Sequence, residues 1–279
     1  MFKKTAYIFV FAFIIFSFLT RPVKAQEFNF EKAYQDYTFT IDQYSQSFSE
    51  YQKAKDFYLK NQTLTLKEEA RKKTLVMLRN RDELERVYLN ALRLKIIELK
   101  GLTGDEKNNI ISKLDSEIEW YKNHKENYKD TDVLEDLFNK SKESESRYET
   151  HTTPISYDSL YNISLGEVVG IKNDHEEVYV AIKKELDGEV SKGTLRLDPF
   201  NRWLTDIDLV IQNLKANETK SKEEIDKIYS QNYTNPSNSF REASAVLLSS
   251  KSLLGQLNSF LHELLTSFNA QLQSQNLTK

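Results

Sequence analysis

Residues 30–58 carry apolar side chains at alternating intervals of four and three residues, the spacing of one face of a long helix. Five of the eight are tyrosines, and the set comprises Phe30, Tyr34, Tyr37, Ile41, Tyr44, Phe48, Tyr51 and Tyr58. The pattern lasts about four heptads and predicts one helix over residues 28–61, about 50 Å long at 1.5 Å per residue. Seven glycines and four prolines in 279 residues leave few places to turn, so the rest of the chain favours long helices too.

Capping motifs mark where the next helices begin. Thr65 with Glu68 predicts the start of a second helix, and Thr103 with Glu106 predicts the start of a third. Gly101 stands where a left-handed residue would end the second helix. Connections of about four residues make consecutive helices antiparallel, so the N-terminal half is expected to run up, down and up.

The middle of the chain is less regular. Asp132 with Glu135 predicts a fourth helix, and Pro154 should kink or interrupt whatever helix reaches it. Gly166 and Gly170 lie four residues apart on one helix face, where the missing side chains would let the backbone of a neighbour approach.

Proline in the first turn predicts helices that start at Pro199 and Pro236, and Ser221 with Glu224 predicts a short helix between them. The last helix is expected to extend to about residue 273. Together the patterns predict an all-α fold, an elongated antiparallel helical bundle of about six to eight helices with coiled-coil-like long helices. Residues 26–279 are expected to form a single domain, with a sub-boundary near residue 130.

The first 25 residues have the three parts of a secretory signal peptide. Lys3 and Lys4 form a positive start, an apolar run of 14 residues spans 6–19, and small side chains stand at Val23 and Ala25. The apolar run is shorter than the roughly 20 residues that a membrane-spanning helix needs, although retention as an anchor is the alternative. We therefore expect cleavage after Ala25 and a secreted or cell-envelope-associated protein, typical of a bacterial product.

Charge and composition narrow the partners. Cleavage would remove four basic residues and no acidic one, which takes the formal net charge from −3 to −7. This modest acidity, with lysines and glutamates interleaved, argues against nucleic acid as a partner. The chain has no cysteine, so burial alone must stabilise the fold after export. A protein or glycan partner and self-association both remain open.

The tyrosines of the first helix are the candidate interaction face, represented by Tyr34, Tyr37, Tyr44 and Tyr51. One interpretation is a core seam whose hydroxyls reach the edge of the bundle. The other is an open groove that binds a protein or a glycan, because tyrosine offers a large contact area at low entropy cost. Burial of these rings distinguishes the two interpretations.

The sequence contains no recognisable catalytic, cofactor or metal motif, and none of these sites is expected. None of the four histidines has the spacing of a di-iron or zinc helix motif. The leading hypothesis is therefore a non-enzymatic exported interaction or scaffold protein. A glycan- or ligand-binding helical module that uses the tyrosine-rich first helix is one alternative. A membrane-active helical protein is the other, because the last helix is rich in leucine and phenylalanine.

Overall fold

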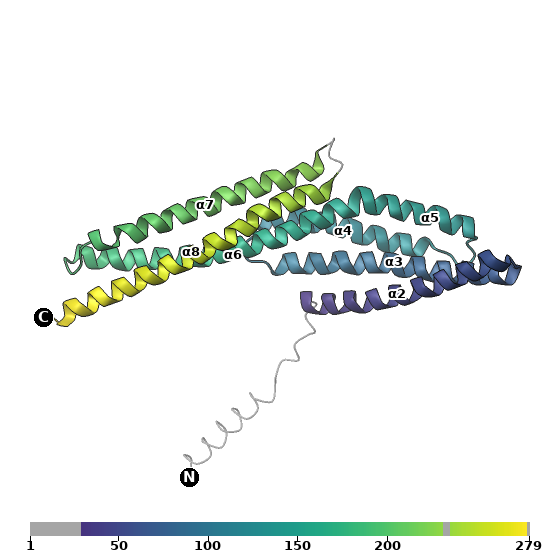
Figure 1. The fold of residues 1–279 in the computed structure, drawn as a ribbon, viewed down its shortest axis with the longest axis horizontal. Coiled ribbons are helices and arrows are strands. Elements are labelled where there is room, and N and C mark those ends of the chain that lie inside the picture. The colour runs from purple at the N-terminus through teal and green to yellow at the C-terminus, as the bar shows by residue number, and fades with distance from the viewer. Residues whose placement is uncertain (1–28, 231–234, 278–279) are drawn as a thin grey trace, which may run out of the picture.

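The computed structural model describes residues 29–230 and 235–277, and these ranges form helices and short connections without a β-strand (Figure 1). The all-α prediction is confirmed for this part of the chain, whereas the predicted signal peptide, residues 1–25, lies outside it. The α-helices are α2 (Phe30–Asn61), α3 (Leu64–Glu98), α4 (Gly104–Asn127), α5 (Leu134–Arg147), α6 (Thr153–Ser191), α7 (Asn201–Asp226) and α8 (Pro236–Leu277). A π-helical turn, η1 (Tyr148–Thr152), joins α5 to α6, and the 3₁₀ turns η2 (Asp198–Phe200) and η3 (Lys227–Tyr229) flank α7.

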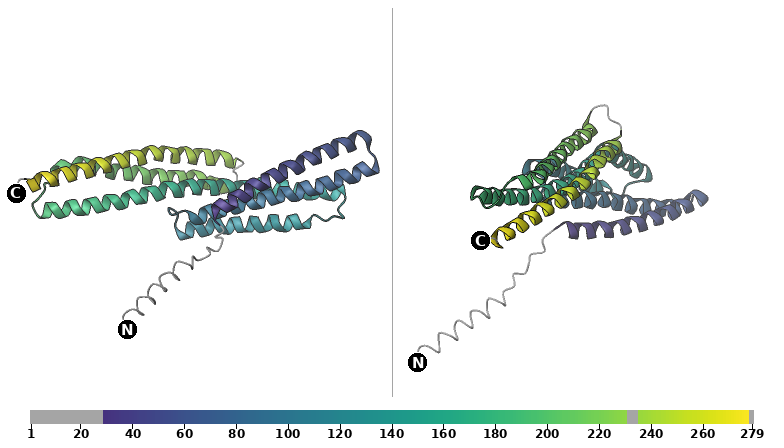
Figure 2. Two further views of the ribbon diagram at one scale, coloured as in Figure 1. Left: turned by 90° about the horizontal axis from the view of Figure 1, so that it is seen from below. Right: turned by 60° about the vertical axis from the view of Figure 1, so that its left-hand side comes forward.

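The molecule is elongated, with α2–α5 towards one end and α6–α8 reaching to the other (Figure 1). Short loops fold α3 back along α2 and α4 back along α3, while α8 packs against both α7 and α6. Figure 2 shows these neighbours side by side from two further directions. α6 also contacts α3 and α4, so this one helix connects the two ends.

Two large hydrophobic cores support this arrangement. The central core combines fully buried side chains of α3, α4, α6 and α8, among them Leu89, Leu114, Leu165 and Ala243. A second core lies between α6, α7 and α8. The predicted sub-boundary near residue 130 falls between α4 and α5, and the central core joins residues from both sides of it.

The face of α2 that packs on α3 differs from the predicted aromatic seam. Its buried residues are small and recur every seven positions: Ala33, Thr40, Ser47 and Ala54. The two hydroxyls donate to backbone carbonyls of α2 itself, which satisfies them without a partner on α3. Small side chains let two helices approach closely. The large apolar residues are therefore displaced to the flank of the contact, where Tyr34, Ile41 and Phe48 are exposed.

Helix starts follow the capping chemistry with two shifts. The Thr103–Glu106 capping box forms as predicted. α3 begins two residues earlier than expected, because the Thr63 hydroxyl accepts the Leu66 N–H and caps it first. α5 begins after Val133, whose N–H donates to Asp136, so the predicted start at Asp132 is wrong. The Asp132 carboxylate instead accepts the Lys129 N–H.

Gly101 has a different role from the one its position indicates. Its φ angle is not left-handed; it lies against α6, and an added Cβ would stand 2.1 Å from the Gly166 oxygen and 2.4 Å from the Gly170 nitrogen. The close backbone approach predicted for Gly166 and Gly170 is therefore present, with the loop after α3 as the neighbour. This contact holds α3 and α4 against α6.

Pro154 does not break the helix but is preceded by the π-helical turn η1. Proline lacks an N–H, and in a regular α-helix its ring would clash with the carbonyl four residues earlier. The π-helical turn on its N-terminal side spaces the hydrogen bonds more widely and so accommodates the ring. α5, η1 and α6 consequently form one nearly continuous rod. α6 then runs to Ser191, where Gly193, with φ of 71°, supplies the left-handed residue after the helix.

The predicted short helix at Ser221 does not form separately, because α7 continues to Asp226. The Ser221 hydroxyl is buried and hydrogen-bonds to that of Tyr161 at 3.0 Å instead of capping a helix. The final helix starts at Pro236 as predicted, with the Asn235 side chain accepting the Asn238 N–H. Within residues 29–230 and 235–277, no helix is long and apolar enough to span a membrane.

Candidate functional site

A groove runs along α3 between α2 on one side and the rod of α5, η1 and α6 on the other. It consists of three adjoining cavities of about 290, 430 and 310 Å³. The first two share Leu84, Glu85 and Tyr148, and the second and third share Ser141. We call this feature the tyrosine groove, and its parts the cage cavity, the middle cavity and the apolar cavity.

The α2 wall of the tyrosine groove is a column of four tyrosines, Tyr37, Tyr44, Tyr51 and Tyr58. They recur every seven residues and therefore point the same way from the helix. Each is half-buried and follows by four residues one of the small residues that contact α3, so the rings lie beside that contact. The heptad spacing and the small-residue contact together turn these rings towards the groove.

The opposite wall is the α5–η1–α6 rod. It contributes Phe138 to the apolar cavity, and Tyr148 and Tyr157 to the cage cavity. Phe138 is 59% exposed and Tyr148 is 46% exposed, so both present ring surface to solvent. Tyr148 opens the π-helical turn, which places this change of helical register directly beside the groove. π-turns inside α-helices occur often at functional sites.

The floor of the groove is α3, and its chemistry changes along the length. Ala70, Met77 and Leu78 line the apolar cavity, together with Leu134 and Leu137 of α5. Seven residues further along α3, Glu85 lines both the middle cavity and the cage cavity. One end of the groove is thus aliphatic, and the other combines aromatic rings with a carboxylate.

Glu85 is the most unusual ionisable group of this site. Its pKa is raised to about 7: burial raises it most, Arg81 lowers it in part, and the nearby Asp82 raises it by a smaller amount. Among the described residues, no side chain or backbone group forms a hydrogen bond or ion pair with the Glu85 carboxylate. Burial also raises the pKa of Tyr88 to about 12 and raises the pKa values of Tyr37, Tyr44 and Tyr148, so these hydroxyls keep their protons at neutral pH.

Behind the groove lies a buried polar cluster at the junction of α3, α4 and α5. The Asp82 carboxylate is bound by the His124 ring at 2.5 Å and by the Ser144 hydroxyl at 3.1 Å. This is not a nucleophile–base arrangement, because Ser144 donates to the aspartate and not to the histidine. The cluster anchors the helices, and Trp120, stacked on the His124 ring, covers it.

Arg81 also acts as an anchor. Its guanidinium donates to Ser141 of α5 at 3.0 Å and to the Tyr128 hydroxyl at 3.3 Å, and it lies 3.5 Å from Asp82. These contacts tie the floor of the middle cavity to its wall. Arg81 therefore holds the groove together and does not neutralise Glu85 through a direct ion pair.

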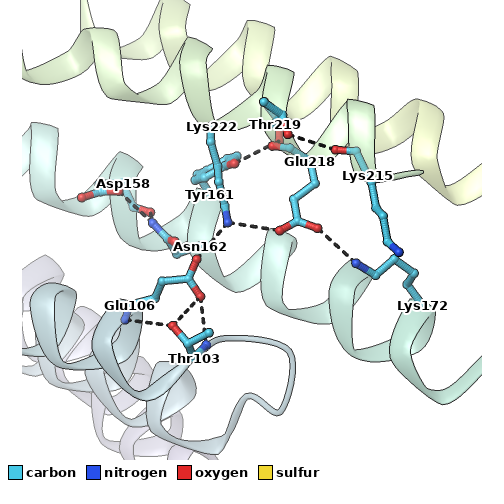
Figure 3. Close-up of polar contacts among 11 residues, drawn as sticks. Thr103, Glu106, Asp158, Tyr161, Asn162, Lys172, Lys215, Glu218, Thr219 and Lys222 are labelled. Carbon is cyan, nitrogen blue, oxygen red and sulfur yellow. Dashed lines mark hydrogen bonds and ion pairs between the residues drawn. The ribbon is translucent and has the colours of Figure 1, made fainter. Parts of the chain in front are cut away.

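A second polar region joins α4, α6 and α7 on a cavity of about 360 Å³. Figure 3 shows Lys222 between two carboxylates, with Nζ 2.9 Å from Glu106 and 3.1 Å from Glu218. Glu218 also pairs with Lys172 at 3.2 Å (Figure 3). On the same cavity, Asp158 accepts hydrogen bonds from Lys113 and from the Tyr229 hydroxyl. Because these charges are matched, we interpret the region as a clamp between helices rather than a binding site.

The four tyrosines singled out from the sequence are divided by the structure. Tyr37, Tyr44 and Tyr51 line the tyrosine groove, each in a different cavity. Tyr34 does not line it; its ring is 55% exposed, 5.9 Å from the ring of Phe30 and 6.3 Å from the ring of Tyr37. Spacing alone identified the column on α2. The residues of the other wall and Glu85 carried no signal of their own, because they come from helices that meet only in the folded chain.

No family model, no curated protein and no solved structure matches this chain. Within the described ranges, no group of three or more histidine and acidic side chains has the geometry to hold a metal ion. The tyrosine groove is therefore characterised by its own geometry: an open channel with aromatic walls, an aliphatic end and a carboxylate at the other end.

Proposed function

We propose that this chain is a non-enzymatic binding protein that holds a polypeptide segment of a partner in the tyrosine groove. The observation that carries the proposal is the groove itself, with tyrosines from α2, α3, η1 and α6 exposing their rings to one channel. Tyrosine, with its large and rigid ring, is enriched in binding surfaces that must form contacts at low entropy cost. Four tyrosines at heptad spacing on one wall give repeated contacts along an extended ligand.

The dimensions fit a short peptide. The groove follows α3 from Ala70 to Tyr88, which corresponds to about 27 Å of helix at 1.5 Å per residue. About eight residues of extended polypeptide span that length at 3.3 Å each. The apolar cavity, lined by Met77, Leu78 and Leu137, suits an aliphatic side chain of such a segment. A sugar, whose rim is polar, would leave this cavity unmatched, which favours a polypeptide over a glycan.

The proposal includes an exported location, with the signal peptide cleaved after Ala25 and the protein released or held at the cell envelope. It also includes the finer description of the fold, an elongated bundle of six to eight helices in which α2 and α3 pair in a coiled-coil-like manner. The small residues of α2 support this pairing, since they bring α2 close to α3 and place its tyrosines at the edge of the contact, where they line the groove.

Selection from a displayed library of random eight-residue peptides against the mature chain, residues 26–279, tests the proposal. We expect selected peptides to bind the wild-type chain and to lose about tenfold or more in affinity on Tyr148→Ala and on Phe138→Ala, the loss of one well-packed aromatic contact. Both side chains are exposed and belong to none of the hydrophobic cores, so their truncation leaves the core intact. Phe39→Ala is the matched control, because it removes a similarly exposed aromatic ring of α2 that lines none of the three cavities.

Two results would contradict the proposal. Peptides that bind all three variants equally would place the binding surface elsewhere. A panel of oligosaccharides that binds with the same variant pattern, when no peptide does, would show that the groove takes a glycan.

A further inference from the structure

The cage cavity has the composition of a site for a positively charged group. Tyr37, Tyr88, Tyr148 and Tyr157 surround a space of about 290 Å³. The rings of Tyr37 and Tyr88 lie 5.4 Å apart, which leaves both within reach of one group in the cavity. Faces of aromatic rings carry negative electrostatic potential and attract ammonium and guanidinium groups within about 6 Å of the ring centre.

Glu85 adds a carboxylate to the same cavity. Other carboxylates with restricted solvent access have partners: Asp82 binds His124 and Ser144, and Glu117 binds Arg147. Glu85 stands apart, since no hydrogen bond or ion pair reaches its carboxylate within residues 29–230 and 235–277. A half-buried carboxylate is less well solvated than an exposed one, so a cation in the cavity would supply a favourable interaction that Glu85 lacks.

We propose that the cage cavity binds an organic cation, an ammonium or guanidinium group, between the four tyrosine rings and the Glu85 carboxylate. Resting on the proposed function, this inference identifies the group as a lysine or arginine side chain of the bound polypeptide. Leu78 and Glu85 are seven residues apart on α3, about 10 Å along the helix. An extended peptide covers that distance in three residues. The preferred segment therefore carries an aliphatic residue and a basic residue three positions apart.

Of the groups that surround the cavity, Glu85 is the one whose charge changes near neutral pH, and its ionisation therefore controls binding of the cation. Arg81, Asp82 and Tyr88 lie near it on α3. Tyr37 and Tyr44 face it from α2, Tyr121 from α4, and Glu145, Tyr148 and Tyr157 from the rod of α5, η1 and α6. The titrations of Tyr37, Tyr44, Tyr88, Tyr121 and Tyr148 are moved to higher pH by burial. The pKa of Glu85, about 7, therefore sets the pH range in which the cavity gains its charge.

Titration of the mature chain with tetramethylammonium, followed by NMR, tests the cavity without any peptide. We expect saturable binding to the wild-type chain, and no comparable binding of the neutral molecule tert-butanol, which has a similar size. Affinity for the cation should fall about tenfold from pH 8 to pH 6, as the ionised fraction of Glu85 falls from about nine-tenths to one-tenth. Glu85→Gln should weaken binding about tenfold or more and abolish this dependence on pH.

Glu149→Gln is the matched control. Glu149 follows Tyr148 in the π-helical turn η1, and its exposed carboxylate does not line the cavity. Equal binding of tetramethylammonium by wild-type chain and Glu85→Gln, or equal binding of tert-butanol, would overturn the inference.

An experiment with peptides distinguishes the proposed cation site from the proposed peptide-binding function. A selected peptide should bind more weakly when its lysine is replaced by Nε-acetyl-lysine, and this loss should disappear in Glu85→Gln. Peptide binding that ignores acetylation, with no binding of tetramethylammonium, would refute the cation site and keep the groove as a peptide site. Binding of tetramethylammonium by a chain that selects no peptide would keep the cation site and refute the peptide function, leaving a free organic cation as the ligand.

Discussion

Replacing Glu85 by glutamine should stabilise the free protein at neutral and alkaline pH, although it removes a charged residue from the binding site. The pKa of Glu85 is about 7 in the folded chain against an ordinary value of 4.5. Below pH 4.5 the carboxyl is protonated in both folded and unfolded chains and contributes no difference. Between pH 4.5 and 7 the unfolded chain releases its proton first, so the wild-type chain loses stability as the pH rises, and above pH 7 the loss is constant.

The size of the effect follows from the difference in pKa. A shift from 4.5 to about 7 corresponds to at most about 3 kcal/mol, at 1.36 kcal/mol per unit. The Glu85 side chain is only partly buried and is therefore screened by solvent, so we expect a gain of about 1–2 kcal/mol for Glu85→Gln at pH 8. Urea unfolding followed by circular dichroism at pH 4, 6 and 8 measures the free energy of unfolding of both proteins.

Glu83→Gln provides a control of opposite sign from the same helix. Hydrogen bonds from Arg86 and Lys125 hold the pKa of Glu83 below its ordinary value despite its partial burial. The stability that Glu83 contributes is therefore present above the ordinary pKa of 4.5 and lost as the pH falls, so Glu83→Gln should destabilise the protein at pH 8. A Glu85→Gln variant that is less stable than wild type at pH 8, or equally stable at every pH, would refute the description of Glu85 as an unpaired carboxylate.

Two further substitutions test how the helices are held. Gly101→Ala should destabilise the chain by about 3 kcal/mol, because its Cβ would lie 2.1 Å from the Gly166 oxygen and backbone atoms cannot easily move aside. Gly104→Ala, with open space around it, should change stability by less than about 1 kcal/mol. Equal effects of the two substitutions in thermal unfolding would contradict the close contact of α3 with α6. Arg147→Met should lower the free energy of unfolding, measured with urea, by about 3 kcal/mol, because it leaves the buried Glu117 carboxylate without its charged partner. An unchanged free energy of unfolding would show that this pair does not stabilise the junction of α4 with α5.

The sequence predicted the elements of the fold better than their contacts. The capping box at Thr103 and the proline at the start of α8 depend on neighbouring residues, and both form as expected. The four-residue spacing of Gly166 and Gly170 places both on one face of α6, and the backbone of Gly101 does approach that face. These features could be predicted because a few consecutive residues determine them.

Predictions that depended on distant residues were less successful. The spacing of large side chains on α2 indicated an aromatic seam, but the buried contact is formed by small residues such as Ala33 and Ser47, which hydropathy patterns rank low. Ser221 resembled a helix cap locally, and its hydroxyl is instead used by Tyr161, 60 residues earlier. The sequence likewise gave no sign of Glu85, because its surroundings come from helices that meet only after folding.

The most direct test of the tyrosine groove as the ligand site is ¹⁹F NMR of the mature chain labelled with 3-fluorotyrosine. Each resonance can be assigned by a single Tyr→Phe replacement and followed while a selected peptide is added. Binding in the groove should shift the signals of Tyr37, Tyr44 and Tyr51 and leave that of Tyr179 unchanged, because Tyr179 lies in the second core, between α6, α7 and α8. A shift of Tyr179 without change at the other three would contradict the groove as the binding site.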